Sequence, residues 1–256
     1  MKICRFLHNN EIKFGAIQDE SIYEFDANDI FSCQNANLKS NKLSKFEVKI
    51  LSPVAPSKIV CVGRNYSAHA AELGNEVPKE PLLFLKAPSA IITDEESIII
   101  PRQSTQVEHE GELAVIIAKT CKNLTDKDNP FEFVFGYTCL NDVTARDLQK
   151  KDVQFTRAKS FDTFCPIGGY VETDLDVTDI SVKTLVNGVI KQEGRTSQMV
   201  FPVDFLIRYI SNQMTLHPGD VIATGTPAGV SKLTDGDVCR IEIEGIESLS
   251  NPVKSA

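Results

Sequence analysis

The sequence predicts a β-rich α+β fold, and three observations support this prediction. Most apolar runs are short, rich in β-branched residues and bounded by turn residues, as in KIVCVG, ELAVIIAK and DVIATGT, which is typical of strands. Two further stretches read as hairpins, with turns at Asn187-Gly188 and Glu244-Gly245, and Asn-Gly is the pair that a type I′ turn favours. Helical periodicity is confined to a few short segments.

The first part of the chain differs from the rest. Residues 1–52 contain short alternating runs such as MKICRF and IKFGAI, followed by the polar stretch SCQNANLKSNKLSK. The run LSPVAPSKIV then supplies two prolines, which disfavour the continuation of regular structure. We therefore expect a small N-terminal β element and linker over residues 1–52 and a main domain over residues 53–256, with the body of that domain starting near Ser57.

Three segments carry helix signals. The strongest is PVDFLIRYISNQ, residues 202–213, with a proline near its first turn and apolar residues at i, i+1 and i+4. The runs SAHAAEL and TARDLQKKD could each form two turns. The chain has no internal repeat, no regular βαβ alternation and no G-x-G-x-x-G or G-K-[ST] motif, which argues against a doubly wound nucleotide-binding fold.

Composition narrows the possible partners and compartments. The net charge of -8 disfavours nonspecific binding to nucleic acid or to anionic membranes. No run is long and apolar enough to span a bilayer, and the charged start MKICRFLHNNEIKFG does not resemble a signal peptide, so we expect a cytoplasmic protein. The seven cysteines are scattered and form no C-x-x-C pair. We interpret them as reduced, mostly buried thiols.

The run VEHEGELAVII places Glu108, Glu110 and Glu112 at alternate positions. In a continuous strand these three side chains would point the same way. Two carboxylates whose Cα atoms lie roughly 6.5 to 7 Å apart can converge on one hard cation, which prefers oxygen ligands. A solvated strand edge would give the same spacing, so both interpretations stay open.

Two other charged residues stand out singly. Asp142 ends an apolar run in GYTCLNDVTARD, where a side chain that faces a site often lies, although Asn and Asp are equally typical of turns and helix caps. Lys159 lies beside small and aromatic residues in FTRAKSFDTFCP. This context favours partial burial near anionic groups, with an ordinary solvated lysine as the alternative.

Among the four histidines, His69 has the most informative context. In GRNYSAHAAELG it precedes Glu72 by three residues, so a helix would place both side chains on one face. A histidine oriented by a carboxylate can act as a general base, because the carboxylate stabilises the imidazolium that forms. A solvent-exposed ion pair is the alternative. His109 lies between glutamates, and we expect it to pair with one of them.

Taken together, eight segments resemble the fumarylacetoacetate hydrolase family, in the order that the family shows. They span about residues 57–253 and read VGRNYSAHAAE, PLLFLKAPSA, VEHEGELAVII, GYTCLNDVTARDLQ, RAKSFDTFCPIGG, VNGVIKQEGRTSQMVF, GDVIATGTPAGV and IEGIESLSNPV. The resemblance is to short members that act on acylpyruvates, oxaloacetate or 2-hydroxyhepta-2,4-diene-1,7-dioate-type diacids. Residues 1–52 are far shorter than the N-terminal domain of a true fumarylacetoacetase.

The resemblance implies a mixed β-sandwich roll, a homodimer and a divalent cation, usually Mg²⁺, although Mn²⁺ suits the same ligands. Carried over by position, the metal ligands fall on Glu110, Glu112 and Asp142, and Glu108 lies outside the ligand pattern. The catalytic residues fall on His69, Glu72 and Lys159, and the substrate contacts on Arg146, Gln149 and Thr226.

The activity that the resemblance implies is Mg²⁺-dependent cleavage of a C–C bond in a small 2-oxo acid, by a hydrolase or a lyase. The cation would bind the substrate carboxylate and 2-oxo oxygens and stabilise a pyruvate enolate, with Lys159 adding positive charge and His69 activating water. The alternatives are decarboxylation, isomerisation or tautomerisation of diacids of aromatic catabolism. A non-catalytic 2-oxo acid binding protein is the competing class.

Overall fold

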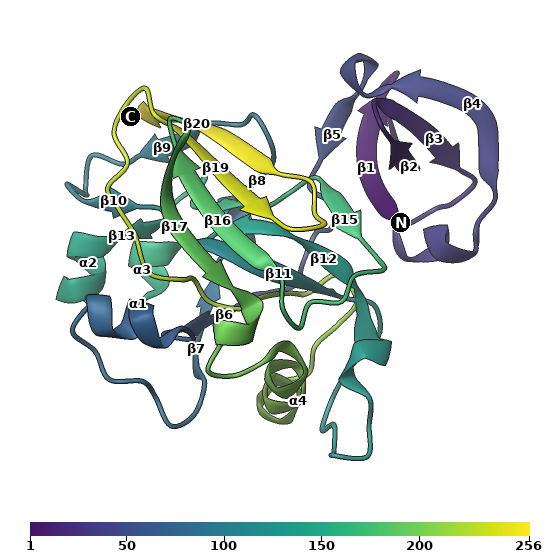
Figure 1. Ribbon diagram of the computed structural model, residues 1–256. Coiled ribbons are helices and arrows are strands. Elements are labelled where there is room, and N and C mark those ends of the chain that lie inside the picture. The colour runs from purple at the N-terminus through teal and green to yellow at the C-terminus, as the bar shows by residue number, and fades with distance from the viewer.

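The computed structural model describes the backbone of residues 1–256 and all side chains except those of Asn35, Ser40 and Asn41. Two sheets form most of the protein (Figure 1). The larger has eleven strands, in the spatial order β4 (Leu38–Ser44), β3 (Ser21–Phe25), β2 (Glu11–Gln18), β1 (Lys2–His8), β15 (Tyr170–Glu172), β12 (Val134–Asn141), β11 (Gly111–Ile117), β18 (Val221–Ala223), β6 (Ile59–Gly63) and β7 (Leu82–Lys86), with β5 (Lys49–Leu51) beside β1.

The smaller sheet has five strands and covers part of the larger one. Its order is β17 (Val189–Arg195), β16 (Ser181–Val186), β19 (Val238–Ile243), β20 (Leu249–Ser255) and β9 (Ile98–Ile100). Two short pairs complete the strands: β10 (Val107–Glu108) with β13 (Thr144–Ala145), and β8 (Ile91–Ile92) with β14 (Cys165–Pro166). Parallel pairing occurs between β18 and β6, β14 and β8, and β20 and β9, among otherwise antiparallel neighbours. The β-rich mixed architecture is therefore confirmed.

Both predicted hairpins are present. Strands β16 and β17 are joined through Asn187 and Gly188, whose φ angles are 52° and 78°, as a type I′ turn requires. Strands β19 and β20 pair across a loop that contains Gly245 at φ 82°.

Four α-helices connect the strands: α1 (Ser67–Glu72), α2 (Arg146–Lys151), α3 (Thr156–Lys159) and α4 (Val203–Gln213). Five single turns of 3₁₀-helix lie at Phe31–Asn35, Lys45–Glu47, Pro88–Ala90, Pro130–Phe133 and Thr196–Gln198. Helix α4 agrees with the predicted span, and it buries Leu206 and Ile210, whereas Phe205 stays 40% exposed and stacks on Tyr209. None of the helices described is long and apolar enough to cross a membrane.

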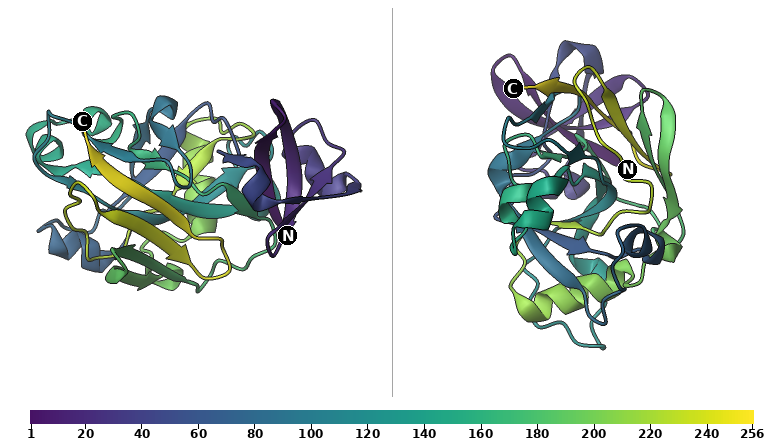
Figure 2. Two further views of the ribbon diagram at one scale, coloured as in Figure 1. Left: turned by 90° about the horizontal axis from the view of Figure 1, so that it is seen from above. Right: turned by 90° about the vertical axis from the view of Figure 1, so that its left-hand side faces the viewer.

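The N-terminal strands form a lobe at one end of the molecule, as Figure 1 and the left view of Figure 2 show. The lobe is continuous with the main sheet, because β1 pairs with β15 at Cys4 and Tyr170. A small apolar cluster in the lobe includes Cys4, Phe6 and Ile22, and one large cluster extends from Phe14 and Phe25 in the lobe through the main domain. The division at residues 52 and 53 stays a prediction.

Strand β11 is the centre of the large core. All seven of its residues are buried, because it pairs on both edges, with β12 and β18, while β16 and β19 pack against it. The two sheets approach closely at Gly111, where an added Cβ would lie 2.1 Å from Thr184 Oγ1 of β16. The seven cysteines are buried free thiols, as predicted.

Candidate active site

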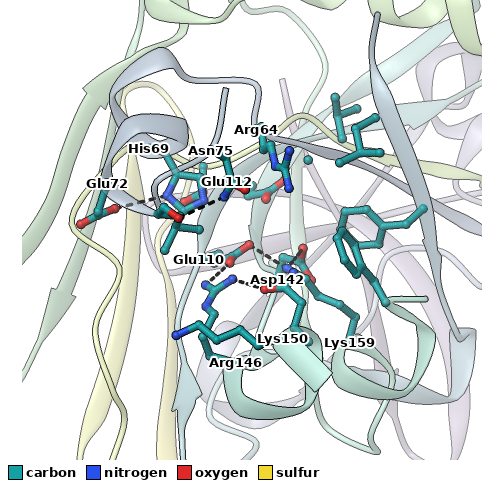
Figure 3. Close-up of a pocket in the computed structure, with 18 residues that line it drawn as sticks. Arg64, His69, Glu72, Asn75, Glu110, Glu112, Asp142, Arg146, Lys150 and Lys159 are labelled. Carbon is teal, nitrogen blue, oxygen red and sulfur yellow. Dashed lines mark hydrogen bonds and ion pairs between the residues drawn. The ribbon is translucent and has the colours of Figure 1, made fainter. Parts of the chain in front are cut away.

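A cavity of about 390 Å³ opens where β11 begins and β12 ends (Figure 3). Its lining includes every residue to which the resemblance assigns a role: His69, Glu72, Glu110, Glu112, Asp142, Arg146, Gln149, Lys159 and Thr226. These residues lie up to 157 positions apart in the chain, and the cavity volume suits a small organic molecule. Their common location is observed, and their individual roles stay predictions.

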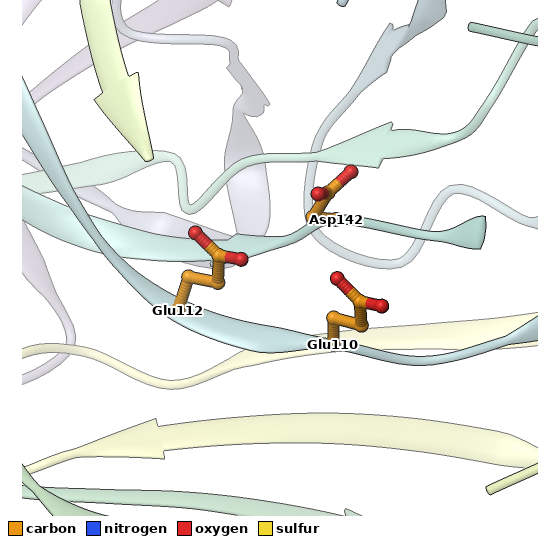
Figure 4. A group of neighbouring side chains, drawn as sticks. All are labelled: Glu110, Glu112 and Asp142. Atoms are coloured by element: carbon orange, nitrogen blue, oxygen red, sulfur yellow. The ribbon is translucent and has the colours of Figure 1, made fainter. Parts of the chain in front are cut away.

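Three carboxylates converge on one side of this cavity. Glu110 immediately precedes β11, Glu112 lies within it, and Asp142 immediately follows β12. The two strands are antiparallel neighbours, with Gly111 opposite Asn141, so the start of one lies beside the end of the other. One oxygen from each carboxylate lies within 4.8 Å of the others, and Figure 4 shows the three side chains as neighbours.

Glu108, Glu110 and Glu112 do not lie in one continuous strand, contrary to the expectation from their alternate spacing. Pairing breaks at residues 109–110, where the Glu110 amide donates to the Asn141 side chain and the Glu110 carbonyl accepts from the Asp142 amide, at 2.9 and 2.8 Å. All three glutamates are at most 6% exposed. A solvated strand edge is therefore wrong.

Glu108 differs from Glu110 and Glu112 in its hydrogen-bond partners. Its carboxylate accepts hydrogen bonds from Arg146 Nε at 2.7 Å and from the Gln106 amide at 2.6 Å. The same guanidinium donates through Nη2 to Glu110. Glu108 thus orients the Arg146 guanidinium toward Glu110. This role could not be predicted from the spacing of the glutamates.

Two buried lysines complete the surroundings of the carboxylates. Lys159 lies at the end of α3, 2% exposed, and its Nζ contacts Glu110 Oε2 at 2.8 Å and Asp142 Oδ2 at 2.7 Å. Lys86 ends β7, and its Nζ contacts Asp142 Oδ1 at 2.6 Å and the Val143 carbonyl at 3.2 Å. Lys159 is therefore not a solvated lysine. Lys86 was missed, because in LLFLK it reads as the polar end of an edge strand.

The titration behaviour of the cluster follows from this arrangement. Burial opposes ionisation of Glu110, but Lys159 and Arg146 outweigh it and hold the pKa of Glu110 well below its usual range. Burial raises the pKa of Glu112 well above its usual value, and the charges of Asp142 and Glu110 raise it further. Burial also disfavours the charged form of Lys159, but Asp142 and Glu110 raise its pKa.

A divalent cation fits this cluster. When all four are ionised, Glu108, Glu110, Glu112 and Asp142 carry four negative charges, which Lys86, Arg146 and Lys159 offset only in part. Among the side chains that the structure describes, Glu112 has no cationic partner, and its one hydrogen bond comes from the Gly225 amide at 2.7 Å. A buried carboxylate left this way is costly, and hard cations such as Mg²⁺ and Mn²⁺ prefer such oxygen ligands.

The His69–Glu72 pair lies on helix α1, at the cavity wall (Figure 3). His69 Nδ1 is 3.3 Å from Glu72 Oε2, and the Gly229 amide donates to both oxygens of Glu72 at 3.0 and 3.1 Å. His69 is only 4% exposed, so the alternative of an ordinary exposed ion pair is wrong for the histidine. Its Nε2 is left to act in the cavity.

The three residues predicted to contact substrate are partly engaged within the protein. Arg146 donates through Nη1 to Gln149 Oε1, in addition to its contacts with the glutamates. Thr226 donates its hydroxyl hydrogen to the Gly111 carbonyl at 2.8 Å. Both residues line the cavity, yet their strongest hydrogen-bonding groups already have protein partners.

Two cations at the cavity were not singled out from the sequence. Arg64 and Lys150 both line the cavity. Neither forms an ion pair with a carboxylate among the side chains that the structure describes. Arg64 has φ 58°, a left-handed conformation that is uncommon for residues other than glycine. The GRN and QKK contexts in the sequence gave no signal that these charges share a cavity with Asp142.

The expectation that His109 pairs with a neighbouring glutamate is wrong. His109 is fully buried, with Nδ1 3.0 Å from Gln192 Oε1 and Nε2 2.8 Å from Ser231 Oγ. Burial lowers the pKa of His109. These partners come from β17 and from the segment after β18, which sequence spacing cannot place beside residue 109.

Comparison with known proteins agrees with this architecture. The family profile described as fumarylacetoacetate (FAA) hydrolase C-terminal matches residues 58–254, and the profile described as Rv2993c-like, N-terminal matches residues 1–53. An uncharacterised protein of Methanocaldococcus jannaschii is 51% identical over 218 residues, which cover 85% of this chain and 92% of that protein.

Two named proteins are also similar. An oxaloacetate tautomerase of Bacillus subtilis is 41% identical over 235 residues, covering 86% of this chain and 77% of that protein. The crystal structure of a 2-hydroxyhepta-2,4-diene-1,7-dioate isomerase from Mycobacterium marinum is 40% identical, with a TM-score of 0.90 and coverage of 100% of this chain and 98% of that one.

Proposed function

Because the chain belongs to the fumarylacetoacetate hydrolase family, we propose that it is a divalent-metal-dependent enzyme that moves a proton at C3 of a small 2-oxo diacid and so interconverts its tautomers or isomers. One observation carries the proposal. A buried carboxylate trio with incomplete charge compensation shares a cavity with an oriented His–Glu pair. The names of two relatives, an oxaloacetate tautomerase and a dioate isomerase, support this reaction class.

Glu110, Glu112 and Asp142 are the residues that would hold Mg²⁺ or Mn²⁺. When bound, the cation supplies a Lewis acid for the 2-oxo oxygen and a second point of attachment for the adjacent carboxylate. With all four carboxylates ionised, a bound divalent cation changes the net charge of the cluster and its three cationic side chains from one negative to one positive. That balance favours binding of an anionic substrate.

Lys159 and the His69–Glu72 pair would divide the chemistry. Lys159 Nζ, fixed by Glu110 and Asp142, places a positive charge where negative charge develops as a proton leaves C3. His69 Nε2 would take and return that proton, while Glu72 favours the imidazolium and keeps the ring oriented. The Gly229 amide holds Glu72 in turn, so the pair is preorganised.

Arg64 and Lys150 would recognise the distal carboxylate of a diacid. They are the cavity cations without an ion-pair partner among the described side chains, so their charge is available to a ligand. The left-handed backbone of Arg64 costs conformational energy, and strain of this kind is concentrated at ligand sites.

Cleavage of the C3–C4 bond is a second candidate, supported by the same His69–Glu72 pair. In place of a proton on C3, His69 would deprotonate a water that attacks a distal carbonyl of an acylpyruvate. Decarboxylation of oxaloacetate would need only the positive charges around the 2-oxo oxygen. Both reactions release pyruvate, whereas tautomerisation does not, so the two candidates differ in a product that is easily measured.

The deciding experiment follows three signals with purified protein and Mg²⁺: exchange of C3 hydrogens of oxaloacetate with D₂O, formation of pyruvate, and turnover of acetylpyruvate. Parallel samples contain EDTA, and a Mg²⁺ blank corrects for uncatalysed decarboxylation. We expect metal-dependent exchange that is much faster than pyruvate formation. Pyruvate formed as fast as exchange would favour cleavage, and tight binding of these acids without turnover would identify a binding protein.

A further inference from the structure

The side chain of Gln192 is a fully buried amide that connects the two halves of the cavity wall. It projects from β17 in the small sheet. Its Oε1 accepts from the Gly111 amide at 3.0 Å and faces His109 Nδ1 at 3.0 Å. Its Nε2 donates to Thr226 Oγ1 at 2.7 Å and to the Pro227 carbonyl at 2.6 Å. Every hydrogen-bonding position of the amide is therefore used.

Backbone groups fix the orientation of this amide. The Gly111 N–H can only donate, so it must face the oxygen of Gln192, and the Pro227 carbonyl can only accept, so it must face the nitrogen. His109 Nδ1 then has to carry a hydrogen and donate it to Gln192. His109 Nε2 is left as an acceptor for the Ser231 hydroxyl. With a neutral His109, the network therefore has one consistent arrangement of hydrogens.

The first end of this connection lies in the carboxylate cluster. Gly111 is the residue between Glu110 and Glu112, so the bond from its amide holds the backbone from which both carboxylates project. Gly111 also approaches β16 so closely that it cannot carry a side chain without displacing Thr184. The position of the strand relative to the small sheet is thus tightly determined.

The second end lies in the segment 224–231, which has no regular secondary structure. This segment supplies the Gly225 amide to Glu112 and the Gly229 amide to Glu72. It packs directly on β17, since a Cβ at Gly229 would lie 2.0 Å from the Lys191 carbonyl. Beyond Thr226, the Pro227 carbonyl accepts from Gln192, the Gly229 amide donates to Glu72, and the Ser231 hydroxyl bonds to His109.

We propose that Gln192 is a positioning residue, which holds the segment 224–231, and with it Glu72 and His69, in register with the carboxylates. The inference rests on the proposed function for its catalytic meaning, but the connection itself can be tested without any substrate. A displacement of about 1 Å between catalytic groups can cost about 10²-fold in rate. Gly225 and Thr226 also bond directly to Glu112 and Gly111, and Gln192 extends this connection to Pro227 and β17.

Gln192→Glu is the sharpest test, because it cuts the connection at one end only. The new carboxylate keeps acceptors for the Gly111 amide and for His109, which can pair with it as an imidazolium, but it presents an oxygen to the Pro227 carbonyl. Gln192→Leu removes all four contacts. Glu193→Gln is the matched control on the same strand, since its side chain is exposed and makes only a surface ion pair.

The readouts are hydrogen exchange in peptides covering 225–231 and 111–117, Mn²⁺ affinity by calorimetry, and kcat and KM with oxaloacetate. In Gln192→Glu we expect exchange in 225–231 to rise about tenfold or more while 111–117 is unchanged. We expect kcat to fall about 10- to 100-fold with Mn²⁺ affinity unchanged or tighter. Glu193→Gln should match the wild type in every readout.

Unchanged exchange in 225–231, or a lower melting temperature with unchanged kcat, would overturn the inference. Loss of folding in both Gln192 variants would also overturn it, because Gln192 would then be a requirement of the fold. A wild type without activity on any 2-oxo acid refutes the proposed function, yet leaves the exchange and Mn²⁺ results to decide whether Gln192 connects the two segments.

Discussion

Asp220 and Glu112 are both carboxylates that the fold removes from solvent, yet their surroundings differ. Asp220 accepts from the amides of Ser57, Lys58 and His217 at 3.0, 3.1 and 2.8 Å, from the Ser57 hydroxyl and from Lys58 Nζ. Burial opposes its ionisation, but these partners outweigh it and lower the pKa of Asp220. Glu112 has one amide donor, and its pKa is raised.

The difference shows how a buried charge can be assigned to stability or to function. A carboxylate saturated with donors joins chain segments, here the start of the main domain and the loop before β18. A carboxylate with too few donors makes the metal-free fold less stable, and it is retained where a ligand compensates it. The contrast predicts opposite outcomes for two similar amide substitutions.

The largest expected effect is on catalysis in Glu112→Gln. Metal-dependent turnover should fall about 10³-fold or more, because the Lewis acid contributes several kcal/mol and each 1.36 kcal/mol is tenfold in rate. Initial rates over a Mg²⁺ titration measure it. Wild-type activity at low Mg²⁺ would contradict the ligand assignment of Glu112.

His69→Ala should lower kcat by about 10² to 10⁴, the usual contribution of a positioned acid or base. Mn²⁺ affinity should stay the same, since His69 lies outside the carboxylate trio. Glu72→Gln is the milder companion variant, because an amide oxygen can still accept from Gly229. An equal loss of metal affinity in His69→Ala would assign the histidine to the metal site instead.

Metal binding should be visible in stability as well as in rate. Mg²⁺ at 100 times its dissociation constant should raise the free energy of unfolding by about 2.7 kcal/mol. Thermal melts in Mg²⁺ and in EDTA give the comparison. Glu112→Gln should lose this increment and Asp220→Asn should keep it. The melts therefore distinguish the roles of the two residues without any substrate.

Asp220→Asn should destabilise the protein by about 1 to 3 kcal/mol at pH 7, because buried donors lose a charged acceptor. The pKa of Asp220 is lowered in the folded state. Its stabilisation is therefore present above the pKa of the unfolded chain and is lost as pH falls through the folded value. Urea unfolding from pH 7 down to pH 3 should show the two proteins converging, with kcat at pH 7 unaffected.

The smallest expected effect is an increase in stability, not a decrease. In EDTA, Glu112→Gln should be more stable than the wild type at pH 7, by about 1 kcal/mol, because it removes a buried carboxyl group whose ionisation is not compensated. The raised pKa of Glu112 means that the wild type loses stability as pH rises from the unfolded pKa toward the folded one. A metal-free variant that melts below the wild type would show that Glu112 is already satisfied.

Much of the site could be predicted from local spacing. His69 and Glu72 are three residues apart on a short helix, and Glu110 and Glu112 are two apart at the start of β11. The match of both patterns to an ordered set of family motifs then assigned Asp142 to the same site. The resemblance also led to the sandwich architecture, whereas the homodimer stays a prediction.

Long-range pairings could not be predicted. Lys86 meets Asp142 across 56 positions, and Gln192 meets His109 across 83. Such contacts depend on which strands become neighbours, and spacing within one segment carries no information about that. The break in the row at Glu110 has the same origin, since the side chain of Asn141 on another strand accepts a hydrogen bond from the Glu110 amide.

The pairing of β1 with β15 has a consequence for biosynthesis. Cys4 pairs with Tyr170, so one edge of β1, at residues 2–4, lacks its partner strand until the middle of the chain has followed, although β2 can already pair with the other edge. At about 5 to 20 residues per second, that delay is roughly 8 to 33 s. Until then β1 has a free edge at residues 2–4, a template for association with other nascent chains. An expressed fragment that ends before β15 should therefore aggregate more readily than the full chain.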